Sequence, residues 1–260
     1  MYAAHSVDQA VAFCGITAEA ICVACFLLTG ATRELPAVFA YLCYNLFAEV
    51  AGYAIYAHGN GDSYWVYYVV CAIIGYGVEL GVGWELATKI IAPKSPEGRK
   101  KVRRGVWQAF IIFAFIAAAV ASGTSYRHVE KGVGLFFKCE LGFAIFRALM
   151  FAGILIATHV WSIDRYDRRA YILVNLAAYS LFALLAEIAH ELAAVMADQY
   201  GTYLWVERLR SSVWCGCMLI LSWQIALYQE RRQVRACCRA QRSPRSLHIG
   251  AGGTPDIRDP

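Results

Sequence analysis

Apolar runs of about twenty residues or more recur along this chain and constrain its fold more than any other feature. Seven such runs occupy residues 7–29, 36–57, 64–91, 105–123, 133–161, 169–197 and 204–228. A helix rises about 1.5 Å per residue, so about 20 apolar residues cross the hydrocarbon core of a bilayer. Charged residues make up 17% of the 260, whereas about 25% is usual in soluble domains. The sequence therefore predicts an all-α, polytopic bundle of seven transmembrane helices, filling a domain of residues 1–228.

Basic residues are concentrated beside alternate ends of these runs. They follow the first, third, fifth and seventh runs: Arg33; then Lys89, Lys94, Arg99, Lys100, Lys101, Arg103 and Arg104; then Arg165, Arg168 and Arg169; then Arg231, Arg232, Arg235, Arg239, Arg242 and Arg245. Residues 58–63 contain no Lys or Arg, and residues 124–132 contain only Arg127 and Lys131. Cytoplasmic loops of membrane proteins are enriched in Lys and Arg. This pattern predicts an N-terminus outside and a C-terminus in the cytoplasm.

The formal net charge of +5 comes from these loops and from the tail. Because the charge follows membrane topology, it does not indicate a nucleic-acid partner. Residues 229–260 are polar and basic and contain Gly and Pro, which predicts a disordered cytoplasmic tail. A cationic tail of this kind is attracted to anionic lipid headgroups. The predicted partners are thus the lipid bilayer, membrane proteins or further copies of this chain.

Several ionisable residues fall inside the apolar runs, where each costs at least about 2.5 kcal/mol on insertion scales. With the predicted orientation, one outer-leaflet polar pocket would gather five of them: Glu49, Glu140, Glu187, His190 and Glu191. Glu79 and Arg147 lie nearer the middle of their runs and would form the floor of that pocket. This set is the candidate ligand site.

Three interpretations of the set stay open. Glu187 and His190 are three residues apart, and an E-x-x-H pair joined by a carboxylate such as Glu140 suits a divalent metal. Di-metal bundles use two such pairs, and this chain has one. Alternatively, Glu140 or Glu187 pairs with Arg147, while His190 and Glu191 meet headgroups or water. A proton relay or a ligand pocket is the third interpretation.

Several cofactors and motifs are excluded by position. Retinal needs a lysine deep in the last helix, and residues 203–228 contain none. A haem held by two histidines needs both at one depth, but His159 and His190 fall at opposite ends of neighbouring helices. Glu187-Ile-Ala-His-Glu191 is not the H-E-x-x-H zinc motif. Gly77 and Gly81 have the small-xxx-small spacing that predicts close approach of another helix backbone.

Two aromatic segments in the first third of the chain are similar to segments of a known group of proteins. Arg33-Glu-Leu-Pro-Ala-Val-Phe-Ala-Tyr41 contains Pro-x-x-Phe-x-Tyr, and Tyr64-Trp-Val-Tyr-Tyr68 follows, with Glu79 or Glu85 later. The first third of the chain resembles a group of uncharacterised bacterial seven-transmembrane-helix proteins. That resemblance implies a bacterial inner membrane and seven helices, and it transfers no activity or site residue.

Three functional classes follow. The first is a non-catalytic membrane module, either a subunit of a larger complex or a sensor-like bundle with an outward-facing polar pocket. It is favoured because the loops are short and no catalytic constellation is complete. The second is a transporter or proton-coupled carrier that uses Glu79, Glu140 and Arg147. The third is an intramembrane metalloenzyme built on Glu49, Glu140, Glu187 and His190.

Overall fold

The described residues of the computed structural model, 2–58, 61–91, 96–124, 131–160, 168–193 and 199–242, are almost entirely helical. They form α1 (Tyr2–Leu28), α2 (Ala31–Glu34), α3 (Pro36–His58), α4 (Gly61–Ile90), α5 (Pro96–Gly123), α6 (Lys131–Val160), α7 (Arg168–Ala193) and α8 (Gln199–Arg242). Seven of these helices are long and apolar enough to cross a membrane. The predicted all-α fold with seven membrane-spanning helices is confirmed at this level.

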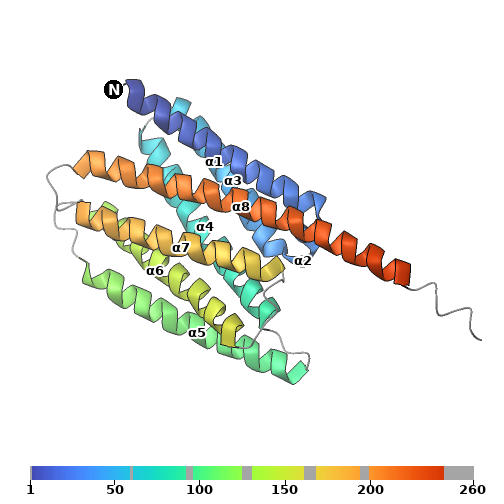
Figure 1. Cartoon of the computed structure of the whole chain (residues 1–260). Helices are drawn as coiled ribbons and strands as arrows, with labels where there is room; N and C mark the ends of the chain where they lie inside the picture. The colour runs from blue at the N-terminus through green and yellow to red at the C-terminus, as the bar shows by residue number, and fades with distance from the viewer. Residues whose placement is uncertain are drawn as a thin grey trace, which may run out of the picture.

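The long helices lie beside one another, and successive long helices run in opposite directions (Figure 1). α8 packs against both α1 and α7, so the first and last helices of the chain are neighbours. α4 contacts α3, α5, α6 and α7. We call the end where α2 lies and α5 begins the basic end, because Arg99, Lys100, Lys101, Arg103 and Arg104 are exposed there. The opposite end, where α1 begins, is the amino end.

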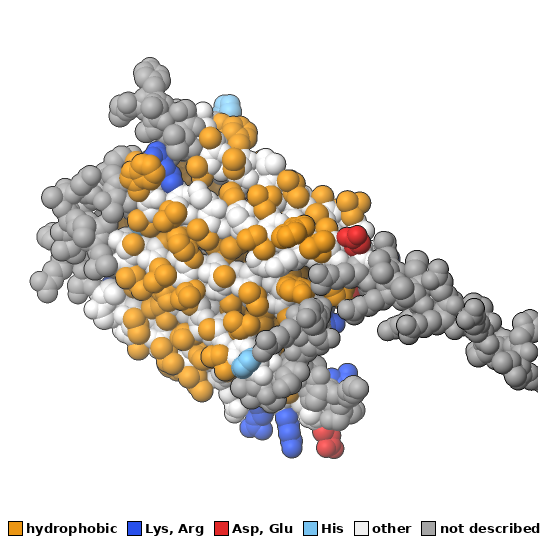
Figure 2. Space-filling model, viewed as in Figure 1, with side chains coloured by type: hydrophobic (Ala, Val, Ile, Leu, Met, Phe, Trp, Pro, Cys, Tyr) orange, Lys and Arg blue, Asp and Glu red, His pale blue; other side chains and the backbone are white. Residues whose placement is uncertain are grey.

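Apolar side chains fill the interior and also cover the outside. Leu86, Met150 and Met218 are buried in the core, whereas Phe115 and Leu28 are 72% and 84% exposed. Figure 2 shows hydrophobic side chains over the visible face, with Lys and Arg gathered mainly at one end. An apolar exterior of this extent suits a hydrocarbon solvent, because apolar patches on soluble monomers seldom exceed a few hundred Å².

The observed helices differ most from the predicted ones in three respects. α5 begins at Pro96 rather than near residue 105, because Pro suits the first helical position and Lys and Arg are good helix formers. Where a disordered tail is predicted from residue 229, α8 continues through Arg242, and residues 243–260 lie outside the described part. The short helix α2 was not predicted, and Gly30 precedes it with a φ of 65°, which favours glycine.

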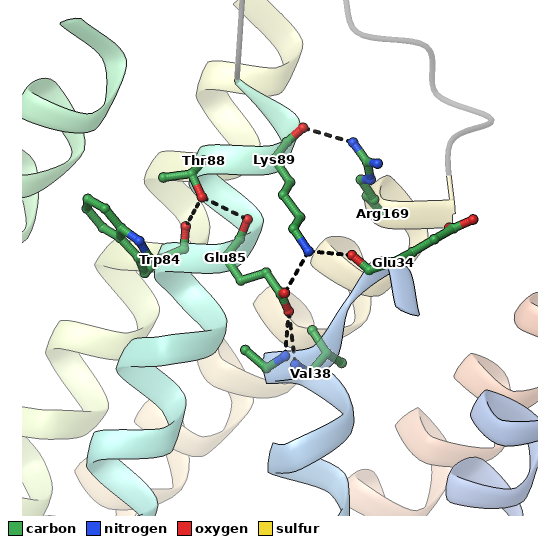
Figure 3. Close-up of polar contacts among 8 residues, drawn as sticks. Glu34, Val38, Trp84, Glu85, Thr88, Lys89 and Arg169 are labelled. Atoms are coloured by element: carbon green, nitrogen blue, oxygen red, sulfur yellow. Dashed lines mark hydrogen bonds and ion pairs between the residues drawn. The ribbon is translucent and has the colours of Figure 1, made fainter. Parts of the chain in front are cut away.

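One carboxylate ties α4 to the start of α3 at the basic end (Figure 3). Oε2 of Glu85 accepts hydrogen bonds from the backbone N–H groups of Ala37 and Val38, at 2.9 and 3.1 Å. Its Oε1 lies 2.8 Å from Nζ of Lys89, which also donates to the carbonyl of Glu34. The first N–H groups of a helix have no partner within the helix. Glu85 therefore caps α3, and we call this arrangement the Glu85 clasp.

The close approach predicted at Gly77 and Gly81 occurs elsewhere on α4. Among the described residues, a Cβ added at Gly77 or Gly81 would meet nothing within 4 Å. At Gly83, however, a Cβ would lie 2.1 Å from Sδ of Met150 on α6. The prediction for Gly77 and Gly81 is wrong because the helix turns those positions away from its neighbours, and Gly83 admits the Met150 side chain instead.

Candidate ligand cavity

A cavity of about 650 Å³, lined by apolar side chains, tyrosines and several charged residues, lies inside the amino half of the bundle. Six helices line it: α1, α3, α4, α6, α7 and α8. Its lining extends from Gln9 and Leu204, near the amino end, to Glu79 and Arg147 about halfway along their helices. Small-molecule sites in proteins usually measure about 300–1,000 Å³. The cavity is therefore large enough to enclose a small organic ligand.

An ion pair between α4 and α6 forms the floor. Nη1 of Arg147 lies 2.9 Å from Oε1 of Glu79, and the Tyr41 hydroxyl donates to the same oxygen at 3.0 Å. The guanidinium of Arg147 also lies over the Tyr179 ring, 5.4 Å from its centroid. Oε2 of Glu79 and Nε of Arg147 are buried with no hydrogen-bond partner among the described residues. The floor is thus charged, rigidly held and only partly satisfied.

A second carboxylate lies beside this floor on α1. Glu19 is 0% exposed, and its Oε1 accepts a 2.6 Å hydrogen bond from Nε1 of Trp214. The Trp214 ring packs against Tyr179 at 4.4 Å and edge-on against Tyr41 at 6.2 Å. Within the described part of the chain, Oε2 of Glu19 has no hydrogen-bond partner. The aromatic rings therefore connect two incompletely satisfied carboxylates, Glu19 and Glu79.

The wall formed by α7 and α8 is held by a network around one arginine. Nη1 of Arg210 lies 2.7 Å from Oε1 of Glu187 and 3.4 Å from Oε1 of Glu207. The His190 ring lies between the same two carboxylates, at 3.8 and 3.5 Å. Arg210 is always charged, so its single positive charge offsets one of the two glutamates whatever the state of the histidine. This wall is therefore a paired structural network.

Tyrosine hydroxyls satisfy much of the remaining polar lining. The Tyr68 hydroxyl donates to Oε1 of Glu140 at 2.7 Å. Tyr67 donates to the Ala48 carbonyl at 2.6 Å, which joins α4 to α3. Eight tyrosines in the described part of the chain line the cavity: Tyr41, Tyr44, Tyr53, Tyr64, Tyr67, Tyr68, Tyr76 and Tyr179. The lining therefore offers aromatic faces as well as carboxylates.

Glu49 on α3 lies against α1, close to Cys215 of α8. A Cβ added at Gly15 on α1 would fall 3.1 Å from Oε2 of Glu49 and 3.7 Å from Sγ of Cys215. The glycine thus makes room for the carboxylate against the helix. No ion pair joins Glu49 or Glu19 to a basic group within the described part of the chain.

Acidic groups outnumber basic groups around the cavity. Among the described residues, the lining contains six glutamates and three arginines: Glu19, Glu49, Glu79, Glu140, Glu187 and Glu207 with Arg147, Arg208 and Arg210. If all are ionised, the formal charge of the lining is three negative. Buried charges without partners are costly, so this excess must be met by a cation or by protons on some of the carboxylates.

The structure brings most of the predicted site together. Glu49, Glu79, Glu140, Arg147 and Glu187 all line the one cavity. His190 contacts Glu187 and Glu207 behind the α7–α8 wall. The side chain of Glu191 lies outside the described residues.

The predicted partner of Arg147 was wrong. Arg147 pairs with Glu79 rather than with Glu140 or Glu187, and Glu187 pairs with Arg210. The physical reason is lateral packing: α4 and α6 meet at this depth, whereas α8 supplies a nearer cation to α7.

The predicted metal set of Glu140, Glu187 and His190 has no metal-binding geometry in the described structure. No group of three or more His, Cys, Asp or Glu side chains there is close enough to hold an ion. The Glu187 carboxylate is instead held by Arg210 and His190, and Glu140 by Tyr68.

Four charged cavity residues were not singled out from the sequence: Glu19, Glu207, Arg208 and Arg210. Glu19 carried a usable signal, because it is the one charged residue of the span Gln9–Leu28. The other three lie close to residue 204, the predicted start of their helix, where a charged residue is expected at the membrane–water interface.

Comparison of the chain with models of protein families, with curated proteins and with solved structures finds no match.

Proposed function

We propose that this chain is a multi-pass membrane protein that binds a small organic ligand in the cavity at its amino end. The observation that carries the proposal is a cavity of about 650 Å³ whose buried polar groups are incompletely satisfied. Most buried polar groups in proteins have a hydrogen-bond partner, so unpaired groups around a cavity of this size are expected to be paired by what fills it, which in this proposal is the ligand. This is the sensor-like form of a non-catalytic membrane module.

The same proposal includes the orientation. Lys and Arg gathered at the basic end support a cytoplasmic location for that end. The amino end and its cavity would then face outside, and the chain would lie in a bacterial inner membrane, as its resemblance implies. Ligand would enter from the outer side.

Native mass spectrometry of gently extracted protein tests the binding function. We expect a mass above the 28.8 kDa chain that corresponds to a small molecule. Replacing two small lining residues with tryptophan, in Ala12→Trp/Ala72→Trp, should remove that mass by occupying the cavity. The matched control is Ala114→Trp/Ala118→Trp on the exposed face of α5, which should retain it. A bare chain in every spectrum would contradict the proposal, and a bound polypeptide would favour the complex-subunit form of the module.

A second candidate function is a carrier. The Glu79–Arg147 pair closes the cavity near the middle of the bundle and has unpaired polar atoms on both partners. Opening of this pair would extend the polar path toward the basic end. Ligand flux into vesicles that is abolished by Glu79→Gln would favour the carrier over a sensor, and binding without flux would favour the sensor.

A further inference from the structure

We propose that the ligand is an organic amine, bound through its ammonium group between Glu19 and Glu49. This inference rests on the proposed ligand-binding function and names the chemical class of the ligand. It depends on two carboxylates from neighbouring helices, on their lack of a basic partner in the described structure, and on the aromatic lining around them.

The two carboxylates lie at the same face of α1: Glu19 belongs to that helix, and Glu49 on α3 rests against it. Gly15 and Glu19 are four residues apart, so they are neighbours on the helix surface, about 6 Å apart. Oε2 of Glu49 rests against α1 at Gly15. Glu49 on α3 is thus placed about one turn from Glu19 on α1, and both line the cavity. Two like charges this close repel one another unless a cation or a proton lies between them.

Glu19 provides a second observation that points to a ligand. Its side chain is 0% exposed, it lines the cavity, and its Oε2 has no partner in the described part of the chain. The paired carboxylates of the cavity behave differently, since Glu187 is held by Arg210 and Glu79 by Arg147. Glu19 and Glu49 therefore hold two of the three excess negative charges of the described lining, and Glu140, which accepts a hydrogen bond from Tyr68, holds the third.

The surroundings favour an organic ammonium. Trp214 and Tyr41 pack together beside Glu19, and Tyr53 follows Glu49 by one helical turn and also lines the cavity. Aromatic faces attract ammonium groups through the ring quadrupole, and carboxylates accept their N–H hydrogen bonds. Val11, Ala12 and Ile16 add apolar lining from α1 for the body of the ligand. An amine carried on an aromatic or aliphatic body matches all three features.

Calorimetry in lipid nanodiscs at pH 7 tests the assignment with matched pairs of probes. Tryptamine is compared with tryptophol, and phenethylamine with 2-phenylethanol, so that each pair differs only in ammonium against hydroxyl. We expect each amine to bind about ten- to a hundredfold more tightly than its alcohol. Equal binding of the members of each pair, or no binding by either amine, would overturn the assignment.

Variants locate the ammonium. In Glu19→Gln/Glu49→Gln the preference for amine over alcohol should disappear, while Glu97→Gln, an exposed residue of α5 outside the cavity lining, should retain it. Should the double variant fail to fold, Glu49→Gln alone removes no hydrogen bond or ion pair of the described structure and should still weaken amine binding about tenfold. A preference that survives in these variants would overturn the site.

The two proposals fail in different ways. If alcohols or anions bind as well as amines, and Ala12→Trp/Ala72→Trp blocks them, the cavity binds ligands but the amine inference is wrong. If no probe binds and native spectra show only the bare chain, the binding function itself fails.

Discussion

Glu79 and Glu85 lie six residues apart on the same helix, and each is 7% exposed, yet their surroundings differ completely. Both oxygens of Glu85 are used in the clasp, by two backbone N–H groups and Lys89. Glu79 uses one oxygen for Arg147 and Tyr41, and its other oxygen has no partner in the described structure. Equal burial therefore does not indicate an equal role, because Glu85 is satisfied by the fold while Glu79 is left partly available beside a cavity.

Glu85 thus has a structural role, whereas Glu79 is a candidate functional carboxylate. A satisfied carboxylate stabilises the fold, and its removal leaves backbone donors buried. An unsatisfied carboxylate costs stability, and its retention requires another benefit. We therefore expect a substitution at Glu85 to change mainly the free energy of unfolding, and a substitution at Glu19 to change mainly ligand binding.

Glu85→Ala should have the largest effect on stability. The change leaves two N–H groups of α3 without an acceptor and the Lys89 ammonium with the Glu34 carbonyl but no carboxylate, which should lower the free energy of unfolding by about 3 kcal/mol. Unfolding in mixed micelles titrated with SDS measures it. Glu85→Gln should recover part of the loss, because its amide oxygen still accepts from the backbone. A change below about 0.5 kcal/mol for Glu85→Ala would refute the capping role.

Arg147→Met should destabilise slightly less, by about 2–3 kcal/mol, at the low end for a buried pair because both partners border the cavity. The Glu79 carboxylate would keep only the Tyr41 hydroxyl as a partner. The double variant Glu79→Gln/Arg147→Met should recover at least half of this loss, because the uncompensated charge is then removed. Additive effects of the two single changes in the same SDS titration would show that the pair is not coupled.

Gly83→Ala should cost about 1–3 kcal/mol through overpacking. The new Cβ would lie 2.1 Å from Sδ of Met150, so the methionine must move. Gly77→Ala is the matched control on the same helix, where a Cβ meets nothing within 4 Å of the described structure. Thermal unfolding of the two variants should therefore differ clearly. Equal stability would show that α4 and α6 do not pack as closely as described.

Glu19→Gln should have the smallest effect on stability, within about 1 kcal/mol of the parent or slightly stabilising. The change keeps an acceptor for Trp214 and removes a buried charge whose second oxygen is unpaired. Binding of a cationic probe should nevertheless fall about tenfold. A loss of stability as large as that of Glu85→Ala would make Glu19 a structural residue. It would contradict the distinction drawn between satisfied and incompletely satisfied carboxylates.

The spans and most of the cavity could be predicted from the sequence, because long apolar runs fix where helices cross and interrupting charges mark polar positions. Glu49, Glu79, Glu140, Arg147 and Glu187 were found in this way and line one cavity. Their pairing could not be predicted, since it depends on which helices are neighbours and how each is rotated.

Two further features depend on packing that no local pattern records. In the Glu85 clasp, Glu85 contacts residues that lie 48 and 47 positions earlier in the sequence. Trp214 and Glu19, which are also in contact, are separated by 195 positions. The extension of α8 to Arg242, by contrast, follows from local propensity, because Arg, Gln and Ala favour helix up to the proline at position 244.

The most direct test of the central claim is an experimental density map of the protein extracted gently from its own membrane. We expect density for a non-protein molecule inside the cavity, with a polar group within hydrogen-bond distance of Glu19 or Glu79. That density should be absent in the Ala12→Trp/Ala72→Trp variant. A cavity that holds only water, or side chains that close it in the parent protein, would contradict the claim that this bundle binds a ligand.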